Sequence, residues 1–134
     1  FRLYLMVRDK NNLSLSIQKN KRIKLLICDI RECHRFSKEI SQINFLIHTA
    51  TAWGDPKRAY EVNIKAFEDL LGMLDKEKLD KIIYFSTASI LNKETELMRE
   101  ALTYGTEYIQ TKYRCFERLR ESSFAEKTFA VFPT

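Results

Sequence analysis

The stretch Asn44-Phe45-Leu46-Ile47-His48-Thr49-Ala50 is apolar on both faces, as expected for a strand buried inside a sheet. The turn Gly54-Asp55-Pro56 follows it, and Leu79 to Phe85 forms a second run of the same kind. Between them, apolar residues recur at steps of three and four, which predicts a helix with one buried face: Tyr60, Val62, Ile64, Phe67, Leu70, Leu71 and Leu74. Strand, helix and strand in this order predict a parallel β-α-β unit.

The same pattern extends in both directions from this unit. We expect further strands at Phe1 to Val7, Ile23 to Cys28 and Thr128 to Phe132, and helices at Arg31 to Ile40 and Glu107 to Glu121. Strands that are apolar on both faces and are separated by helices favour a parallel sheet covered on each side. The sequence therefore predicts a single α/β domain over residues 1–134, a Rossmann-like doubly wound parallel sheet.

Composition narrows the class of protein. Of the 134 residues, 45% are hydrophobic and 31% are charged, which is typical of a globular domain, and no apolar run is long enough to span a bilayer. Three cysteines without a ligand-like spacing favour reduced thiols in the cytoplasm, and we expect no metal site.

The net charge of +5 is unevenly distributed. Residues 1–67 carry 13 basic and 6 acidic side chains (+7), whereas residues 68–134 carry 10 and 12 (−2). Basic residues near the start of the chain suit a phosphorylated ligand or nucleic acid, but a solvated loop is the stronger interpretation. Because no aromatic stacking platform is interleaved with these charges, nucleic-acid binding is the weaker functional option.

Tyr108 and Lys112 are the strongest candidates for chemistry. Four residues apart in a predicted helix, they share one face, where an ammonium group would favour the phenolate. Such a tyrosine can exchange a proton with a substrate hydroxyl. The hydroxyl cluster from Ser86 to Ser89 follows a predicted strand and could orient the same substrate oxygen; alternatively, these small residues only form the turn.

Five pieces of the chain in series resemble the extended short-chain dehydrogenases/reductases, of the NAD-dependent epimerase/dehydratase type. They are Asp29-Ile30, Phe45 to Ala50, the segment that begins at Asn63, Ile83 to Ser89, and Tyr108 to Tyr113 with Phe132-Pro133-Thr134 downstream. The resemblance implies an NAD(P)-dependent oxidoreductase, epimerase or dehydratase that acts on a hydroxyl or carbonyl group of a small-molecule substrate. A homodimer is also implied.

The resemblance also implies roles for individual residues. Tyr108 would be the catalytic acid/base, Lys112 would hold the nicotinamide ribose, and Thr87 would be the catalytic hydroxyl, with Ser86 as its nearest competitor. The remaining cofactor contacts would come from Asp29 and Ile30 at the adenine end, from Thr49, Ala50 and Ala52 along the dinucleotide, from Asn63, and from Pro133 beside the nicotinamide.

Arg8 follows the first predicted strand, where this family selects its cofactor. An acidic residue there would bind the ribose hydroxyls of NAD, whereas a guanidinium suits the 2′-phosphate of NADP. Arg8 therefore favours NADP over NAD, although the adjacent Asp9 points the other way.

One departure from the family pattern bears on activity. The glycine-rich loop that holds the diphosphate is not present, since Gly54, Gly72 and Gly105 lie far apart. In the doubly wound order, the strand that carries this loop would lie between the strands at Leu3 and Asn44. We expect either a longer protein with this segment before Phe1 or an inactive truncated product. The alternative function is a non-catalytic dinucleotide-binding or interaction module.

Overall fold

The computed structural model describes residues 2–134, and every strand pair in it is parallel. The strands are β1 (Leu3–Val7), β2 (Ile23–Ile27), β3 (Phe45–His48), β4 (Lys81–Phe85) and β5 (Thr128–Val131). All five strands expected from the sequence are present, within two residues of the predicted bounds. Phe1, which we placed at the start of the first strand, lies outside the described residues.

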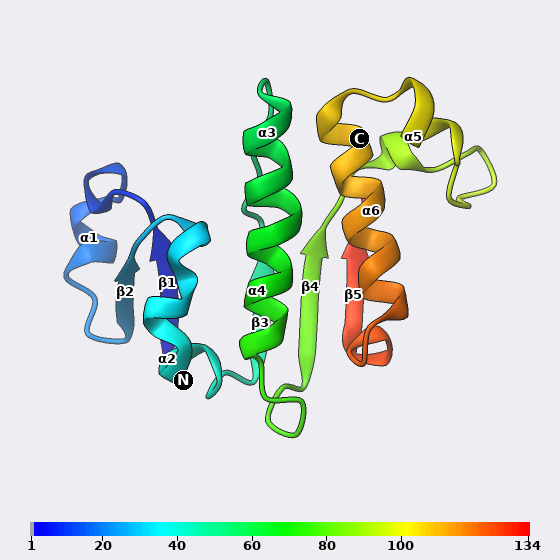
Figure 1. Cartoon of the computed structure of the whole chain (residues 1–134). Helices are drawn as coiled ribbons and strands as arrows, with labels where there is room; N and C mark the ends of the chain where they lie inside the picture. Colours follow the sequence, from blue (N-terminus) through cyan, green and yellow to red (C-terminus); the bar gives the residue numbers. More distant parts are fainter. Residues whose placement is uncertain (1) are drawn as a thin grey trace.

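The strands form two separate sheets, β1–β2 and β3–β4–β5. Leu5 is in register with Leu25 in the first sheet, and Ile83 is in register with both Ile47 and Phe129 in the second. No ladder joins β1 to β3 within residues 2–134. In Figure 1 the strands follow each other as β2, β1, β3, β4, β5. The break between β1 and β3 is where the sequence predicted the missing central strand.

Helical segments connect the strands. α1 (Leu15–Gln18) joins β1 to β2, and the 3-10 segment η2 (Ile30–Phe36) with α2 (Ser37–Ile40) joins β2 to β3. The expected long helix consists of α3 (Pro56–Ala59), a π-helical segment η3 (Tyr60–Lys65) and α4 (Ala66–Met73). α6 (Glu107–Glu121) has the predicted bounds, while α5 (Glu100–Tyr104) was not anticipated. No helix in the described part of the chain is long and apolar enough to cross a membrane.

The main core lies between the three-stranded sheet and the helices α4 and α6. Phe67 of α4, Ile82 and Tyr84 of β4 and Leu119 of α6 are at most 1% exposed. Apolar side chains from both helices thus cover one face of this sheet, and burial of this kind stabilises the domain.

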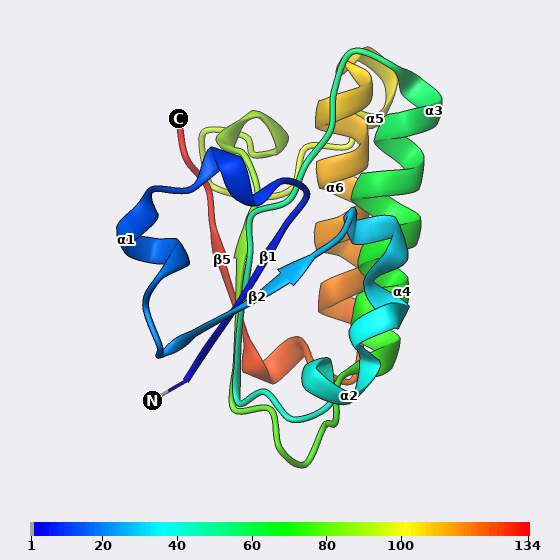
Figure 2. The ribbon, with the colours of Figure 1, turned by 90° about the vertical axis from the view of Figure 1, so that its left-hand side faces the viewer.

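The other face of the three-stranded sheet is bare in the described structure. Figure 2 shows α3, α4, α5 and α6 together on one side of the strands. Phe45, Ile47 and Phe129, which project to the opposite side, are 61%, 62% and 55% exposed. The prediction that each face of the sheet would be covered therefore holds for only one face of the second sheet. The alternation of buried and exposed apolar residues along β3 shows this directly.

Candidate active site

The helix α6 carries both residues of the predicted catalytic pair. Its first turn is capped by the Thr106 hydroxyl, which accepts a hydrogen bond from the backbone N–H of Ile109. Tyr108 and Lys112 follow one helical turn apart, and the Lys112 Nζ lies 5.9 Å from the centroid of the Tyr108 ring. The structure thus brings the two groups together on one face, as their spacing predicted.

Lys112 is almost fully buried, at 3% exposure. Its Nζ donates a hydrogen bond to the backbone oxygen of Phe85, at 2.7 Å, and lies 5.1 Å from the centroid of the Tyr84 ring. Burial lowers the pKa of Lys112, because a low-dielectric environment disfavours its charged form. Since Phe85 ends β4, this contact places the lysine ammonium at the carboxyl edge of the sheet.

Two hydroxyl groups follow β4. The Thr87 side chain caps the short 3-10 segment η4 (Ala88–Ile90): Oγ1 accepts from the Ser89 N–H and donates to the Ser89 Oγ, both at 3.3 Å. The Ser86 Oγ is buried and has no hydrogen-bond partner among the described residues. Thr87 is thus engaged in a local turn, whereas Ser86 has free hydrogen-bonding capacity.

Asn63 lies in the π-helical segment and ties three parts of the site together. Its Oδ1 accepts from the Ala52 N–H at 2.7 Å, and its Nδ2 donates to the Ala52 carbonyl at 2.8 Å and to the Thr111 Oγ1 at 2.9 Å. Thr111 in turn donates to the carbonyl of Tyr108. A π-helical turn often marks a functional site, and this one presents Asn63 to both the β3 loop and α6.

A buried polar cluster lies behind the catalytic pair, and the sequence did not reveal it. His48 packs against the rings of Phe67 and Tyr84, at centroid distances of 4.4 and 5.9 Å, and these two rings also stack on each other at 5.3 Å. Burial, with a smaller contribution from the Lys112 charge, lowers the pKa of His48 to about 3. The Cys115 Sγ donates to the Asn63 carbonyl, and burial raises the pKa of this thiol to about 12. His48 and Cys115 are therefore uncharged at neutral pH.

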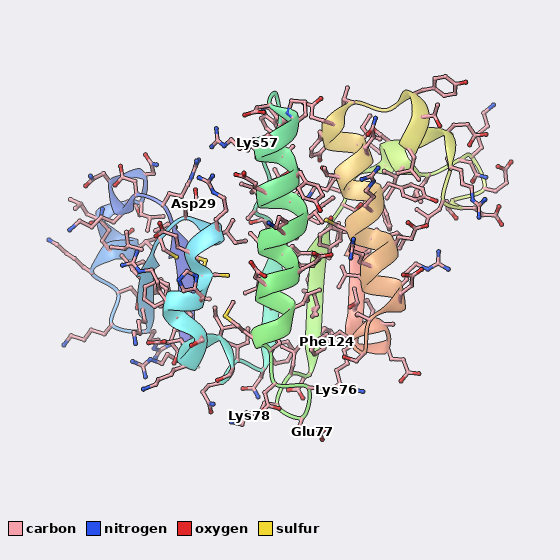
Figure 3. The ribbon with its side chains drawn as sticks, viewed as in Figure 1. Asp29, Lys57, Lys76, Glu77, Lys78 and Phe124 are labelled. Carbon is pink, nitrogen blue, oxygen red and sulfur yellow. The ribbon has the colours of Figure 1, made fainter. Side chains whose placement is uncertain are left out.

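The predicted adenine-end residues lie on the first sheet, away from Tyr108. Asp29, labelled in Figure 3, follows β2 and accepts from the Arg31 Nε and Nη2 at 2.9 and 3.1 Å. This pairing lowers the pKa of Asp29, with a weaker contribution from the Arg8 charge. Arg8 is exposed just beyond β1, and Ile30 is half-buried against the main core. Asp29 is thus paired with a guanidinium inside its own turn.

The remaining predicted residues lie at the carboxyl ends of the second sheet. Thr49 is exposed, Ala50 half-buried and Ala52 buried in the loop after β3. Pro133 follows β5, and its carbonyl accepts from the Ala88 N–H at 3.1 Å, which holds the end of the chain beside η4. Predicted site residues from β1, β2, β3, β4 and β5 therefore share one edge of the fold.

This edge fits the two ends of a dinucleotide. At the nicotinamide end, the Ser86 Oγ is free and the Lys112 ammonium, with three donors, is given one hydrogen bond by the described residues, so donors remain for ribose hydroxyls. The loop after β3 carries only small side chains at Ala50 and Ala52. Residues 2–134 contain no glycine-rich turn to hold the diphosphate between these ends.

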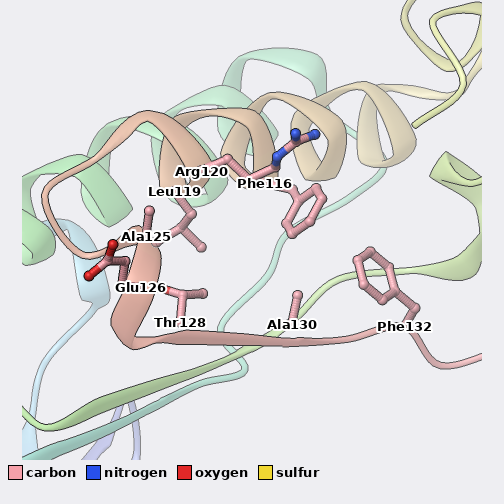
Figure 4. A pocket seen from close by; sticks show the side chains of 8 residues that line it. All are labelled: Phe116, Leu119, Arg120, Ala125, Glu126, Thr128, Ala130 and Phe132. Carbon is pink, nitrogen blue, oxygen red and sulfur yellow. The ribbon is translucent and has the colours of Figure 1, made fainter. Parts of the chain in front are cut away.

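A separate hollow of about 530 Å³ lies between α6 and β5 (Figure 4). Its walls are mostly apolar, with the rings of Phe116 and Phe132 in edge-to-face contact at 5.2 Å, and with Arg120 and Glu126 at the rim. None of the predicted site residues lines it, so the candidate active site is elsewhere, at the strand ends.

A Rossmann-like α/β fold with a Tyr-x-x-x-Lys helix defines the class as the extended short-chain dehydrogenases/reductases. The sequence pattern of the 3-beta hydroxysteroid dehydrogenase/isomerase family matches residues 4–128, and the chain belongs to this family. None of the curated proteins compared matches this chain.

Solved structures share the fold at low sequence identity. Pen from Bacillus thuringiensis superposes with a TM-score of 0.75 at 18% identity, over 98% of this chain and 43% of its own. The Bordetella bronchiseptica enzyme WbmH, in complex with NAD+, gives a TM-score of 0.72 at 13% identity, over 98% of this chain and 48% of its own.

A third relative is UDP-glucose-4-epimerase from Stenotrophomonas maltophila, with bound NAD and formylated UDP-arabinopyranose. It gives a TM-score of 0.72 at 15% identity, over 98% of this chain and 45% of its own. The chain therefore spans a little under half the length of these structures.

Proposed function

We propose that this chain supplies the catalytic part of an NAD(P)-dependent dehydrogenase, epimerase or dehydratase. The observation that carries the proposal is the placement of the buried Lys112 ammonium, 5.9 Å from the Tyr108 ring and hydrogen-bonded to the last residue of β4. A buried cation beside a phenol stabilises the phenolate, because the low dielectric strengthens their attraction.

In the proposed reaction, Tyr108 moves the substrate proton. In the oxidative direction, the phenolate oxygen accepts the proton of the substrate hydroxyl as the C–H bond breaks; in reduction the phenol returns a proton to the carbonyl oxygen. The nicotinamide, when bound, would take or give the hydride. Thr87 would hold the substrate oxygen, once its hydroxyl turns away from Ser89, and Lys112 would hold the ribose hydroxyls and the phenolate.

The test of this role is Tyr108→Phe in a protein that joins the chain to a strand, glycine-rich loop and helix before Phe1. We expect hydride transfer, followed by NAD(P)H absorbance, to fall by about 10²–10⁴, the usual contribution of a proton-transferring group, while cofactor binding stays unchanged. Tyr104→Phe is the matched control, because Tyr104 is 85% exposed in α5 and belongs to no predicted site. Equal turnover in the two variants would refute the assignment.

The same assay distinguishes the two candidate hydroxyls. If Thr87 orients the substrate, Thr87→Ala should lower kcat strongly and Ser86→Ala only slightly. The reverse order would transfer the role to Ser86, whose hydroxyl has no partner in the described structure.

For the cofactor, we propose NADP, with NAD as the alternative that the NAD-bound relatives favour. Arg8 is exposed at the end of β1, and its charge acts on Asp29, so a 2′-phosphate could replace Asp29 as its partner. Arg8→Ala should weaken NADPH binding about tenfold, as expected for one lost charge-assisted hydrogen bond, and leave NADH binding unchanged. If the wild type and Arg8→Ala bind NADPH with equal affinity, the result would favour NAD as the cofactor.

A non-catalytic module remains the second candidate. It is favoured by the engagement of Asp29 with Arg31 and of Thr87 with Ser89, which leaves two predicted ligand contacts occupied within the chain. Titration of NADPH and NADH against the loop-bearing protein, followed by assay of turnover, separates binding without reduction from catalysis.

A further inference from the structure

Exposed basic side chains gather at the amino ends of β1 and β2, the end of the first sheet that lies opposite the candidate active site. They come from the residue before β1, from the turn between α1 and β2, and from β2 itself, and together they form a basic cluster: Arg2, Lys19, Lys21, Arg22 and Lys24. The Leu3 N–H donates to the Arg22 carbonyl at 2.9 Å, so the turn and the start of β1 are adjacent, as Figure 2 also shows.

Most of the charge in the basic cluster is unpaired. Within residues 2–134, Lys24 alone of the cluster pairs with a carboxylate, that of Glu39 in α2, at 2.7 Å. The turn itself is fixed, because the Asn20 Oδ1 accepts from the Arg22 N–H at 2.9 Å and the Asn20 carbonyl accepts from the Ile23 N–H at 3.0 Å. Uncompensated cations on a fixed backbone attract a polyanion, and little further ordering is needed when it binds.

An aromatic ring lies within the basic cluster. Tyr4 is in register with Lys24 across the β1–β2 pair, and Arg2 lies on the same face of β1, two residues before Tyr4. The Arg2 guanidinium carbon and the Lys24 Nζ are 5.7 and 6.0 Å from the centroid of the Tyr4 ring. The basic run from Lys19 to Lys24 contains no aromatic residue of its own, so the pairing of the two strands supplies one.

We propose that the basic cluster and Tyr4 bind a single-stranded nucleic acid. Arg2, Lys21 and Arg22 would pair with backbone phosphates, and a base would pack on the accessible part of the Tyr4 ring. A single strand exposes the faces of its bases for such packing, whereas a duplex hides them. A lipid surface fits less well, because the turn from Lys19 to Arg22 has no apolar side chain to insert among acyl chains.

The test uses the full chain and a labelled oligouridine of about twelve nucleotides, with binding followed by fluorescence anisotropy. We expect saturable binding whose affinity falls about twentyfold between about 50 and 200 mM salt, the result for three phosphate contacts on a single strand. Binding that is absent, or that does not weaken with salt, would overturn the proposal.

Two double variants locate the phosphate contacts. Lys21→Ala combined with Arg22→Ala should bind oligouridine more weakly, and its affinity should fall only about threefold over the same salt range, because two contacts are lost. Lys57→Ala combined with Arg58→Ala is the matched control: it removes the same charge from exposed residues of α3 and should keep the full salt dependence. Equal losses in both proteins would show that net charge attracts the strand, and the proposal would fail.

Tyr4 tests the base contact. Tyr4→Leu should weaken oligouridine binding at least about fivefold and leave the affinity for a duplex of the same length unchanged, because only the single strand can stack on the ring. Tyr4→Phe keeps the ring and should bind oligouridine within about twofold of the wild type. If Tyr4→Leu binds oligouridine as tightly as the wild type, no base packs on the ring and the single-strand proposal is wrong.

Two further measurements exclude a different site and a different partner. Arg8→Ala, at the carboxyl end of β1, should bind oligouridine as the wild type does; a loss as large as that of the Lys21 and Arg22 double variant would place the strand at the proposed cofactor edge and refute the inference. Vesicles of phosphatidylserine and phosphatidylcholine should leave the protein in solution on sedimentation. Co-sedimentation that the same double variant abolishes would make the surface a membrane contact. None of these measurements depends on turnover or on Tyr108, so the proposed function stands or fails separately.

Discussion

The strands of the two sheets are similarly apolar, but they differ in how deeply they are buried. Strands β1 and β2 are as apolar as β3, β4 and β5, yet every residue of β1 is at least partly exposed and Leu26 is the one buried residue of β2. In the second sheet, Ile82 and Tyr84 of the central strand are 0% and 1% exposed. β4 is buried most deeply because it has a strand on each edge and helices across one face, whereas β1 and β2 each have one neighbouring strand within residues 2–134.

The break between β1 and β3 explains this difference. The first sheet contacts the rest of the molecule mainly through η2, which packs on α4. The border of the main core includes Met6 of β1 and, from η2, Ile30 and Phe36. A strand between β1 and β3, where the sequence pattern predicts the strand that carries the glycine-rich loop, would pair with both free edges. We expect such a strand to stabilise the first sheet more than the second.

The largest expected effect comes from shortening one mid-strand residue in each sheet. Ile82→Ala in β4 removes a side chain of 0% exposure and should lower the free energy of unfolding by about 2–5 kcal/mol. Leu5→Ala in β1 removes a half-buried one and should cost less, about 1–2 kcal/mol, because part of its side chain is already exposed in the folded state. Urea unfolding of both variants measures the two losses in free energy of unfolding. Equal losses would mean that the two sheets share one core.

The two histidines lie in different parts of the molecule, His48 in β3 of the second sheet and His34 in η2 after the first sheet. His48 is 4% exposed in the second sheet, and burial lowers its pKa from 6.5 to about 3, whereas His34 is exposed in η2. As the pH falls below 6.5, the unfolded chain binds a proton at His48 that the folded chain resists. The stability contributed by neutral His48 is thus complete above pH 6.5 and is lost progressively toward pH 3.

Between pH values of about 7.5 and 4.5, this loss should amount to about 3 kcal/mol. His48→Phe should remove it, so that the unfolding free energy of the variant falls less with acid than that of the wild type. His34→Gln should leave the acid dependence unchanged. A wild-type slope that persists in His48→Phe would show that carboxylates, rather than His48, cause the acid sensitivity.

The spacing of apolar residues in the sequence predicted the features of the fold that depend only on neighbouring residues. The strands, the bounds of α6 and the shared face of Tyr108 and Lys112 follow from apolar repeats and from a four-residue step. The π-helical segment around Asn63 could not be predicted in this way, because the apolar residues from Tyr60 to Leu74 are spaced as they would be in a regular α-helix.

Features that depend on tertiary approach were also missed. The burial of His48 requires Phe67 and Tyr84 to meet it from other elements. The pairing of Asp29 with Arg31 is local, but it competes with the ligand role that the resemblance implied, so the resemblance did not predict it. Trp53 gave a signal in retrospect: it is a lone tryptophan between a small-residue loop and a Gly-Asp-Pro turn. Its position beside Tyr108, with the two ring centroids 6.1 Å apart, depends on the packing of α6 against α3 and η3.

The smallest expected effect concerns the ion pair between η2, which follows the first sheet, and the π-helical segment η3, which packs with the second sheet's helices. Arg31 pairs with Asp29 in its own turn and also with Glu61 of the π-helical segment, at 3.2 Å. Because Arg31 is exposed, water screens both contacts, and Arg31→Met should leave the urea midpoint unchanged within error.

Hydrogen exchange of the β2 amides should nevertheless become slightly faster in Arg31→Met, since the contact with Glu61 orients η2. Added salt should remove this difference between the variant and the wild type. Arg35→Met is the matched control, because Arg35 pairs with Glu32 inside η2 and does not reach the second region. If the β2 amides exchange at the same rate in both variants, the first sheet and η2 are held to the second sheet and its helices by apolar packing alone, and the ion pair with Glu61 does not contribute.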